Sequence, residues 1–260
     1  MTPTHKPADK AEAAPVLLET RGLSVSFNGF QALSDISLSI RQGELRVIIG
    51  PNGAGKTTFM DLITGKAKPT AGQVLFEGQD ITGKSAAEIA RRYKIGRKFQ
   101  GPNVFDNMTV AENIELAVAG YEGLTQSLFF RASARFRHRV TEILEQIELA
   151  DYRSFMATDL SHGQRQWLEI GMVFAQDPKL IILDEPTSGM TADETRKTGD
   201  MIKKLKGEHT ILVVEHDMDF VRQVADYVTV FNLGKRLVEG TLEAVQQDPE
   251  VQAVYLKEAD

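Results

Sequence analysis

One short segment constrains the fold more than any other: a glycine-rich turn between an apolar run and a helical pattern. Residues 50–57 read Gly-Pro-Asn-Gly-Ala-Gly-Lys-Thr and follow the apolar run 45–49. Glycines let successive backbone N–H groups turn toward one point, and the helix that follows directs the positive end of its dipole there. The pattern G-x-x-x-x-G-K-[ST] in this setting predicts a phosphate-binding loop in an α/β fold that binds a nucleotide.

The loop also predicts which residues hold the nucleotide. Lys56 is expected to reach the β- and γ-phosphates, and the Thr57 hydroxyl is expected to bind Mg²⁺. We therefore expect ATP and Mg²⁺ as cofactors. The alternative is a tight glycine turn beside a surface lysine, and the flanking strand and helix weigh against it. The residues expected to contact the nucleotide here are Gly50, Asn52, Gly53, Gly55, Lys56, Thr57 and Thr58.

A second motif ends the apolar run Leu180–Leu183 with two carboxylates, Asp184 and Glu185. In parallel α/β sheets, ligands gather at the C-terminal ends of the strands, the edge where the phosphate loop also lies. Asp184 is expected to hold Mg²⁺ through water, because Mg²⁺ keeps several waters and takes few protein carboxylates. Glu185 is the candidate for orienting or deprotonating the attacking water. Without a phosphate loop, such a pair is more often a solvated strand end.

The pattern along the chain changes from strands to helices and back. Residues 1–15 are polar and are expected to form a disordered tail. From 16 to 40 apolar residues alternate, which predicts strands with a turn at 28–29. We expect one domain over 16–260, an α/β core with an N-terminal antiparallel β-subdomain and a helical insertion over about 101–165. The strands predicted after the insertion are Leu180–Leu183, Thr210–Val214 and Val228–Leu233.

The composition excludes several classes of protein. The 260 residues carry 30 Lys+Arg and 36 Asp+Glu, a net charge of −6, whereas a dedicated nucleic-acid binder carries a basic excess. The chain has no cysteine, which excludes disulfides and thiolate metal sites and favours a reducing compartment. No apolar run approaches the 18 residues that a membrane-spanning helix needs. We therefore expect a cytoplasmic protein without a nucleic-acid partner.

A third motif decides among the phosphate-loop proteins. Residues 160–164 read Leu-Ser-His-Gly-Gln and precede a helical pattern. Locally, Ser161 as N-cap and Gln164 three residues later form a capping box, and a helix start with free N–H groups also binds anions. The segment resembles the LSGGQ signature of ABC-type ATPases. The resemblance covers about residues 16–256 with six motifs in the expected order, and it implies ATP hydrolysis by a P-loop, RecA-like ABC ATPase core.

The resemblance also implies how the site is completed. In ABC ATPases each ATP lies between one subunit's phosphate loop and the other subunit's signature, so the signature would bind the γ-phosphate in trans through Ser161, Gly163 and Gln164. His216 is similar to the histidine that contacts the γ-phosphate. Gln100 is similar to the glutamine that senses Mg²⁺ and the water and connects to the helical insertion. The resemblance therefore implies catalytic roles for Glu185, His216 and Gln100, and metal binding by Thr57, Gln100 and Asp184.

One aromatic residue matches the ABC ATPase pattern, and two other positions depart from it. Phe27 is similar to the aromatic residue that stacks on adenine, and a core strand residue is the alternative. His162 replaces the second glycine of the signature, so a bulky side chain stands where none is usual. Thr191 stands where many relatives carry aspartate in the loop that crosses the dimer interface, which leaves that contact open.

Three segments resemble the urea-importer ATPases within the branched-chain amino-acid branch. They are residues 97–105, 160–172 and 189–191. In such importers two related ATPase subunits drive two transmembrane permease subunits, which a periplasmic substrate-binding protein supplies. The resemblance predicts a subunit that energises urea uptake from the inner face of the plasma membrane. The rival predictions are a branched-chain amino-acid importer ATPase, a soluble ABC ATPase acting on ribosomes or DNA, and a kinase or GTPase. Cargo identity and the choice between homodimer and mixed dimer stay open.

The expected mechanism couples ATP to movement of the membrane subunits. ATP binding closes the dimer, a shift of the insertion around Gln100 passes the motion to a permease helix, and hydrolysis at Glu185 resets the transporter. Val104, Phe105 and Val110 are candidates for the cleft that receives this helix, and ordinary core residues are the alternative.

Overall fold

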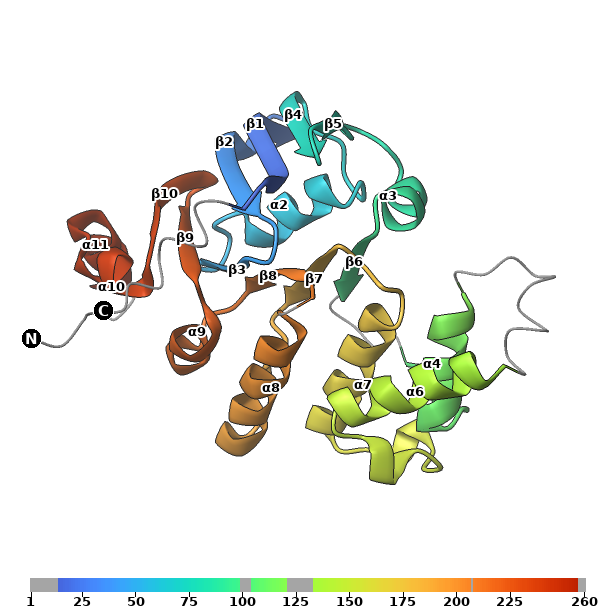
Figure 1. The fold of residues 1–260 in the computed structure, drawn as a ribbon. Helices are drawn as coiled ribbons and strands as arrows, with labels where there is room; N and C mark the ends of the chain where they lie inside the picture. The colour runs from blue at the N-terminus through green and yellow to red at the C-terminus, as the bar shows by residue number, and fades with distance from the viewer. Residues whose placement is uncertain (1–13, 99–103, 121–132, 207, 257–260) are drawn as a thin grey trace, which may run out of the picture. The chain divides into compact units, whose positions relative to one another are not determined.

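The computed structural model describes residues 14–98, 104–120, 133–206 and 208–256 (Figure 1). The chain forms two compact units. The first comprises the residues up to Ile89, the segment Lys206–Ile211 and the residues from Ala225 onward. The second comprises Ala90–Leu205 and Leu212–Val224. Most of the predicted tail lies outside the described residues, and the expected domain boundaries stay predictions.

The first unit contains a four-stranded antiparallel sheet with the strand order β2-β1-β4-β5. Asn28 and Gly29 join the first two strands and both have positive φ, as a two-residue hairpin turn requires. The predicted alternation is confirmed, because Leu23, Ile36 and Ile40 are fully buried. The strands are β1 (Val16–Phe27), β2 (Phe30–Arg41), β4 (Ala71–Phe76) and β5 (Gln79–Asp80).

The same unit holds the strand that leads into the phosphate loop. β3 (Leu45–Ile49) pairs in parallel with β9 (Tyr227–Asn232), which pairs antiparallel with β10 (Lys235–Gly240). The buried Arg46 guanidinium fixes these strands, because it contacts Glu44 at 2.5 Å and Glu239 at 2.9 Å. The helices that belong to this unit are α2 (Lys56–Ile63), α10 (Leu242–Gln247) and α11 (Pro249–Leu256), while α3 (Ala86–Arg92) runs from it into the second unit.

The second unit combines strands with the helices of the predicted insertion. β6 (Ile95–Lys98) and β7 (Leu180–Asp184) pair in parallel, and β8 (Thr210–Val214) enters this unit from the first. Every residue of β7 is buried, which is typical of a strand covered on both faces. The helices are α4 (Val110–Ala119), α6 (Ala134–Gln146), α7 (His162–Phe174), α8 (Ala192–Leu205) and α9 (Met218–Val224), with 3₁₀ turns at Ala150–Tyr152 and Ala157–Asp159.

Helices α4, α6 and α7 pack together, as Figure 1 shows. The predicted apolar face of α6 is confirmed, because Val140, Ile143 and Leu144 are buried. Helix α4 begins with a capping box in which Thr109 and Glu112 exchange hydrogen bonds. Reciprocal bonding satisfies two backbone N–H groups that the helix leaves unpaired, which is why the chain turns into a helix at this point.

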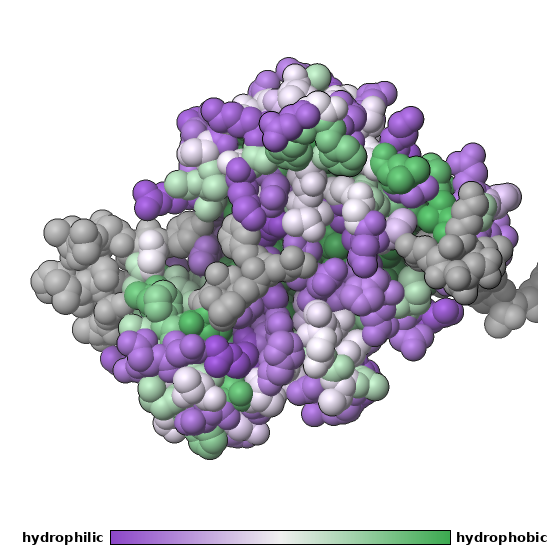
Figure 2. Space-filling model, turned by 180° about the vertical axis from the view of Figure 1, so that it is seen from behind, coloured by the Kyte–Doolittle hydropathy of each residue, from purple (hydrophilic) through white to green (hydrophobic). Residues whose placement is uncertain are grey.

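The surface carries scattered apolar side chains. Figure 2 shows one face on which hydrophilic residues predominate and hydrophobic residues appear in small separate groups. Across the four described stretches, no helix has the length and apolar character required to cross a bilayer. Within these stretches, the large apolar residues with the most exposure are Phe30 at 72% and Leu233 at 84%.

Candidate nucleotide-binding site

The phosphate loop owes its shape to three glycines. Gly50, Gly53 and Gly55 have φ values of 148°, 77° and 99°, in the region that side chains other than glycine rarely adopt. A Cβ at Gly50 would lie 2.1 Å from the carbonyl oxygen of Phe231, and one at Gly55 would lie 2.5 Å from Leu33 Cδ2. A Cβ at Gly53 would meet no atom of the described residues within 4 Å. Two glycines are therefore required by packing and the third by backbone conformation alone.

Helix α2 begins at this loop without a capping side chain. Its N-cap residue is Gly55, so the first backbone N–H groups of the helix have no local side-chain acceptor. The Lys56 ammonium donates to the carbonyl oxygens of Gly50 at 2.5 Å and Pro51 at 3.0 Å. These bonds hold the lysine against the loop, where it is predicted to bind the phosphates of the nucleotide. The arrangement fits an anion at the start of the helix.

Phe27, the predicted adenine-stacking residue, stands at the end of β1 opposite Phe30. Its side chain is 47% exposed, so the core alternative is wrong. An exposed aromatic ring is available to stack on a base, and the stacking role stays a prediction.

The predicted metal ligand Asp184 lies at the end of β7 and is buried. Its Oδ2 atom accepts a hydrogen bond from Arg97 Nη2 at 3.2 Å, and both side chains are almost fully buried. Arg97 comes from the neighbouring strand β6, whose register sets it opposite Ile182. Burial raises the pKa of Asp184 above its ordinary value, and the Arg97 guanidinium opposes the rise.

The second oxygen of Asp184 tests whether the site fits Mg²⁺. Oδ1 is buried and has no hydrogen-bond partner within the part of the chain that the structure describes. Such an oxygen fits a metal-bound water, because buried polar atoms are otherwise paired. No cluster of three or more His, Asp or Glu side chains with metal-binding spacing occurs in the described ranges.

Glu185 and His216 approach each other after adjacent strands. His216 Nδ1 lies 3.9 Å from Glu185 Oε1, and the histidine side chain is 68% exposed. The Glu185 backbone N–H donates to the carbonyl oxygen of Val214 at 2.9 Å, and Glu185 has a positive φ of 47°. That bond joins the ends of β7 and β8, so the two predicted catalytic residues follow strand ends that are held together.

The buried carboxylate of Glu215 connects the two segments that follow β7 and β8. Its Oε1 accepts from the backbone N–H and the hydroxyl of Thr187, at 3.0 and 2.5 Å. Its Oε2 accepts from the His216 N–H at 2.9 Å. The carboxylate thus connects the segment after Glu185 with the segment that carries His216.

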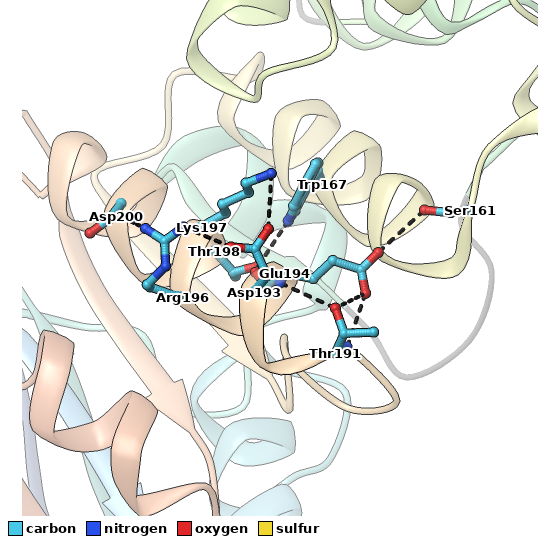
Figure 3. A network of polar contacts seen from close by, with 9 residues as sticks. All are labelled: Ser161, Trp167, Thr191, Asp193, Glu194, Arg196, Lys197, Thr198 and Asp200. Atoms are coloured by element: carbon cyan, nitrogen blue, oxygen red, sulfur yellow. Dashed lines mark hydrogen bonds and ion pairs between the residues drawn. The ribbon is translucent and has the colours of Figure 1, made fainter.

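The signature segment forms the start of α7. Ser161 and Gln164 make the predicted capping box, in which each side chain bonds the other residue's backbone N–H. The buried Trp167 Nε1 donates to Thr198 Oγ1 of α8 at 2.8 Å, which joins the two helices (Figure 3). The capping box is confirmed, and the role of these residues toward phosphate stays a prediction.

Comparison with known proteins decides the family. Residues 33–188 match the family described as ABC transporter. The chain is 36% identical over 252 residues to the branched-chain amino acid transport ATP-binding protein LivG of Salmonella typhimurium, which covers 94% of this chain and 98% of that protein. BraF of Pseudomonas aeruginosa, similarly named, is 35% identical with the same coverage. The chain belongs to the ABC transporter ATPases.

Solved structures agree with this assignment. The ADP conformation of MJ1267, an ATP-binding cassette of an ABC transporter, is 33% identical with a TM-score of 0.82 and covers 94% of this chain and 99% of that one. A dimeric bacterial ABC transporter cassette, MJ0796, is 28% identical with a TM-score of 0.75 and covers 87% and 99%. The chain therefore has the ABC ATPase fold, binds nucleotide and hydrolyses ATP.

The phosphate loop and Phe27 lie in the first unit, whereas Asp184, Glu185, His216 and the signature lie in the second. Gln100 falls outside the described residues. The contacts of Arg97 and Glu215 were not predicted from the sequence. The local sequence around Arg97 gives no signal, because β6 has no apolar pattern, whereas the signal for Glu215 is a carboxylate directly after the apolar run of β8.

Proposed function

We propose that this ABC ATPase is the nucleotide-binding subunit of an importer for branched-chain amino acids. The observation that carries the proposal is the similarity to LivG and BraF, at 35 to 36% identity over nearly the whole of both chains. The prediction of urea as cargo has no support in these similarities, which favour the rival amino-acid prediction. The soluble ABC ATPase alternative and the kinase or GTPase alternative lose their basis, because the relatives are transport proteins.

In this proposal two ATPase subunits form a dimer with an ATP between each phosphate loop and the opposite signature. Lys56 and the first N–H groups of α2 bind the phosphates, and Ser161, Gly163 and Gln164 bind the γ-phosphate of the partner's ATP. The second subunit supplies the signature half of each of the two sites. The dimeric cassette structure of a relative supports this arrangement.

We assign hydrolysis to Glu185 and His216, in the two segments that Glu215 connects. Glu185 orients the attacking water and accepts its proton, and His216 contacts the γ-phosphate. Thr57, Asp184 and Gln100 are the candidates for holding Mg²⁺, which when bound neutralises charge on the phosphate oxygens. Asp184 Oδ1, which has no hydrogen-bond partner among the described residues, supports this assignment because it can accept from a metal-bound water.

The importer also needs a contact with transmembrane permease subunits, and we assign it to the segment around Phe105. Of the three predicted docking residues, Val110 is fully buried and belongs to the core, Val104 is 9% exposed, and Phe105 is 45% exposed. Phe155 is 47% exposed, and its carbonyl oxygen accepts from the Val110 N–H. These apolar side chains suit a permease helix at the inner face of the plasma membrane, with a periplasmic binding protein supplying the cargo.

Uptake of labelled leucine and labelled urea tests the cargo in cells that carry wild-type protein or Glu185→Gln. We expect the variant to retain ATP binding and to lose leucine uptake, because the water is no longer activated. Loss of urea uptake alone would overturn the amino-acid proposal and restore the urea prediction. Unchanged uptake of both would overturn the import role, and normal ATP turnover by purified Glu185→Gln protein would remove the catalytic role of Glu185.

A further inference from the structure

The two departures from the ABC pattern lie in one local structure. His162 Nε2 lies 2.9 Å from the carbonyl oxygen of Ser188, in the loop between β7 and α8. Gly189 gives the ring room, because a Cβ there would lie only 3.1 Å from His162 Nε2. The histidine that replaces a signature glycine therefore contacts the same loop in which Thr191 replaces aspartate.

Thr191 binds the carboxylate that completes this structure. Its backbone N–H and its hydroxyl donate to Glu194 Oε2 at 3.0 and 2.9 Å, and the Glu194 N–H donates back to the hydroxyl. This is the exchange of a capping box, so Thr191 and Glu194 form the start of α8.

The other oxygen of Glu194 reaches the signature. Glu194 Oε1 accepts from the Ser161 hydroxyl at 3.4 Å, the contact drawn in Figure 3. A Cβ on Gly163 would lie 2.4 Å from the same oxygen, so the carboxylate packs directly on this glycine. One side chain thus touches the first turn of α7 and the first turn of α8.

Two physical effects favour this position of Glu194. The carboxylate lies beside the starts of two helices, where each macrodipole stabilises a negative charge. The helices are also joined one turn further along by the Trp167–Thr198 hydrogen bond, which is buried. The two helices therefore have a connection besides Glu194, whose carboxylate touches only their first turns.

We propose that Glu194 and His162 are positioning residues that hold the signature to the Ser188–Thr191 loop within one subunit. We call the contacts of these two side chains with the signature and the loop the clip. The loop follows Glu185, so the clip makes the signature of a subunit and the loop after its own Glu185 move together. The inference rests on the proposed dimeric site, because it gives the signature a role toward the partner's ATP. The clip sets the orientation in which Ser161 meets that phosphate.

Steady-state ATPase kinetics of the purified full chain test the clip. We expect Glu194→Ala to lower kcat about tenfold while KM for ATP stays within about twofold, because the chain's own phosphate loop is untouched. Glu194→Gln keeps an acceptor oxygen and should restore part of kcat. The matched control is Asp193→Ala, an exposed neighbour on α8 that pairs with Arg196 and Lys197 and does not contact the signature (Figure 3).

Two further measurements separate a clip from a general loss of structure. In the Glu185→Gln background, ATP-dependent dimer formation followed by analytical ultracentrifugation should weaken with Glu194→Ala and not with Asp193→Ala. A double-mutant cycle of His162→Gly and Glu194→Gln should give non-additive changes in kcat, because both contacts hold the same loop. Equal effects of Glu194→Ala and Asp193→Ala, additive effects in the cycle, or a faster Glu194→Ala enzyme would each overturn the clip.

The Glu185→Gln protein with no further substitution distinguishes the two proposals in the same experiments. If Glu185→Gln protein with intact Glu194 fails to dimerise with ATP, the proposed dimeric site is wrong and the clip loses its role. If it dimerises and the Glu194 variants match the control, the dimeric site stands and the clip alone is wrong.

Discussion

The phosphate loop and the signature segment both place a helix start where an anion is expected, but they are built differently. The phosphate loop is made of backbone: α2 begins at Gly55 without a capping side chain, and positive φ values shape the turn. The signature is made of side chains, since α7 begins with the Ser161–Gln164 capping box and Glu194 reaches it from α8. A backbone-built site fails when atoms are added, whereas a side-chain-built site fails when atoms are removed.

The sharpest test of the backbone-built site is Gly50→Ala. The added Cβ would lie 2.1 Å from the Phe231 carbonyl oxygen, and the loop cannot retreat while β3 and β9 stay paired. We expect ATP affinity to fall by at least about 100-fold, because hydrogen bonds to phosphate tolerate only small displacements. Isothermal titration with ATP measures this.

Gly53→Ala is the matched control, because its Cβ has open space among the described residues and meets only the positive φ. That strain costs about 1–3 kcal/mol, so Gly53→Ala should bind ATP more tightly than Gly50→Ala. Equal losses in the two variants would show that φ, and not packing, decides the shape of the loop.

In the second unit, we expect Glu215→Ala to cause the largest loss of stability. The substitution removes the acceptor of the Thr187 and His216 N–H groups and leaves the buried N–H and hydroxyl of Thr187 unpaired. We expect the free energy of unfolding to fall by about 3 kcal/mol, measured by urea denaturation. Glu215→Gln keeps the shape and one acceptor and should lose less. A stable Glu215→Ala protein with normal ATP turnover would contradict the bracing role.

The two regions also differ in how far sequence predicts them. The glycine spacing of the phosphate loop fixes its backbone, and the alternation in β1 and β2 fixes which side chains are buried, so both were predictable. The strand β6 was not predicted, because a four-residue strand with Arg97 and Lys98 lacks an apolar pattern. These side chains are buried through ion pairs with Asp184 and Glu169, which come from distant parts of the chain.

The same limit applies to the candidate site. The capping box of Ser161 and Gln164 is local and follows from a spacing of three residues. The contact of Glu194 with Ser161 joins residues 33 positions apart, and nothing in the local pattern of α8 indicates it. Side-chain networks depend on how elements pack, so they appear only when the packing is known.

Helices α7 and α4 begin with equivalent capping boxes, and removing each N-cap hydroxyl tests whether the signature serine does more than cap its helix. Ser161→Ala and Thr109→Ala each remove an N-cap hydroxyl that accepts from the third residue of its helix. Each should lower the free energy of unfolding by about 1 kcal/mol. Only Ser161→Ala should also lower kcat of the purified protein, because Thr109 has no predicted contact with ATP. Equal kcat in the two variants would show that the signature serine acts only as a helix cap.

The smallest expected effect is a shift in the titration of one carboxylate, and it reports on the Thr191–Glu194 contact directly. The backbone N–H and then the hydroxyl of Thr191 lower the pKa of Glu194, and the same two donors of Thr109 lower the pKa of Glu112. A carboxyl whose pKa is lowered by folding stabilises the protein above the unfolded value of about 4.3, and the stabilisation is lost as the pH falls through the folded pKa. Thr191→Val removes only the hydroxyl, so NMR titration should show the pKa of Glu194 rising part of the way and that of Glu112 unchanged. An unchanged pKa of Glu194 would mean that the hydroxyl does not bind the carboxylate in solution. The start of α8 would then depend on backbone donors, as the phosphate loop does.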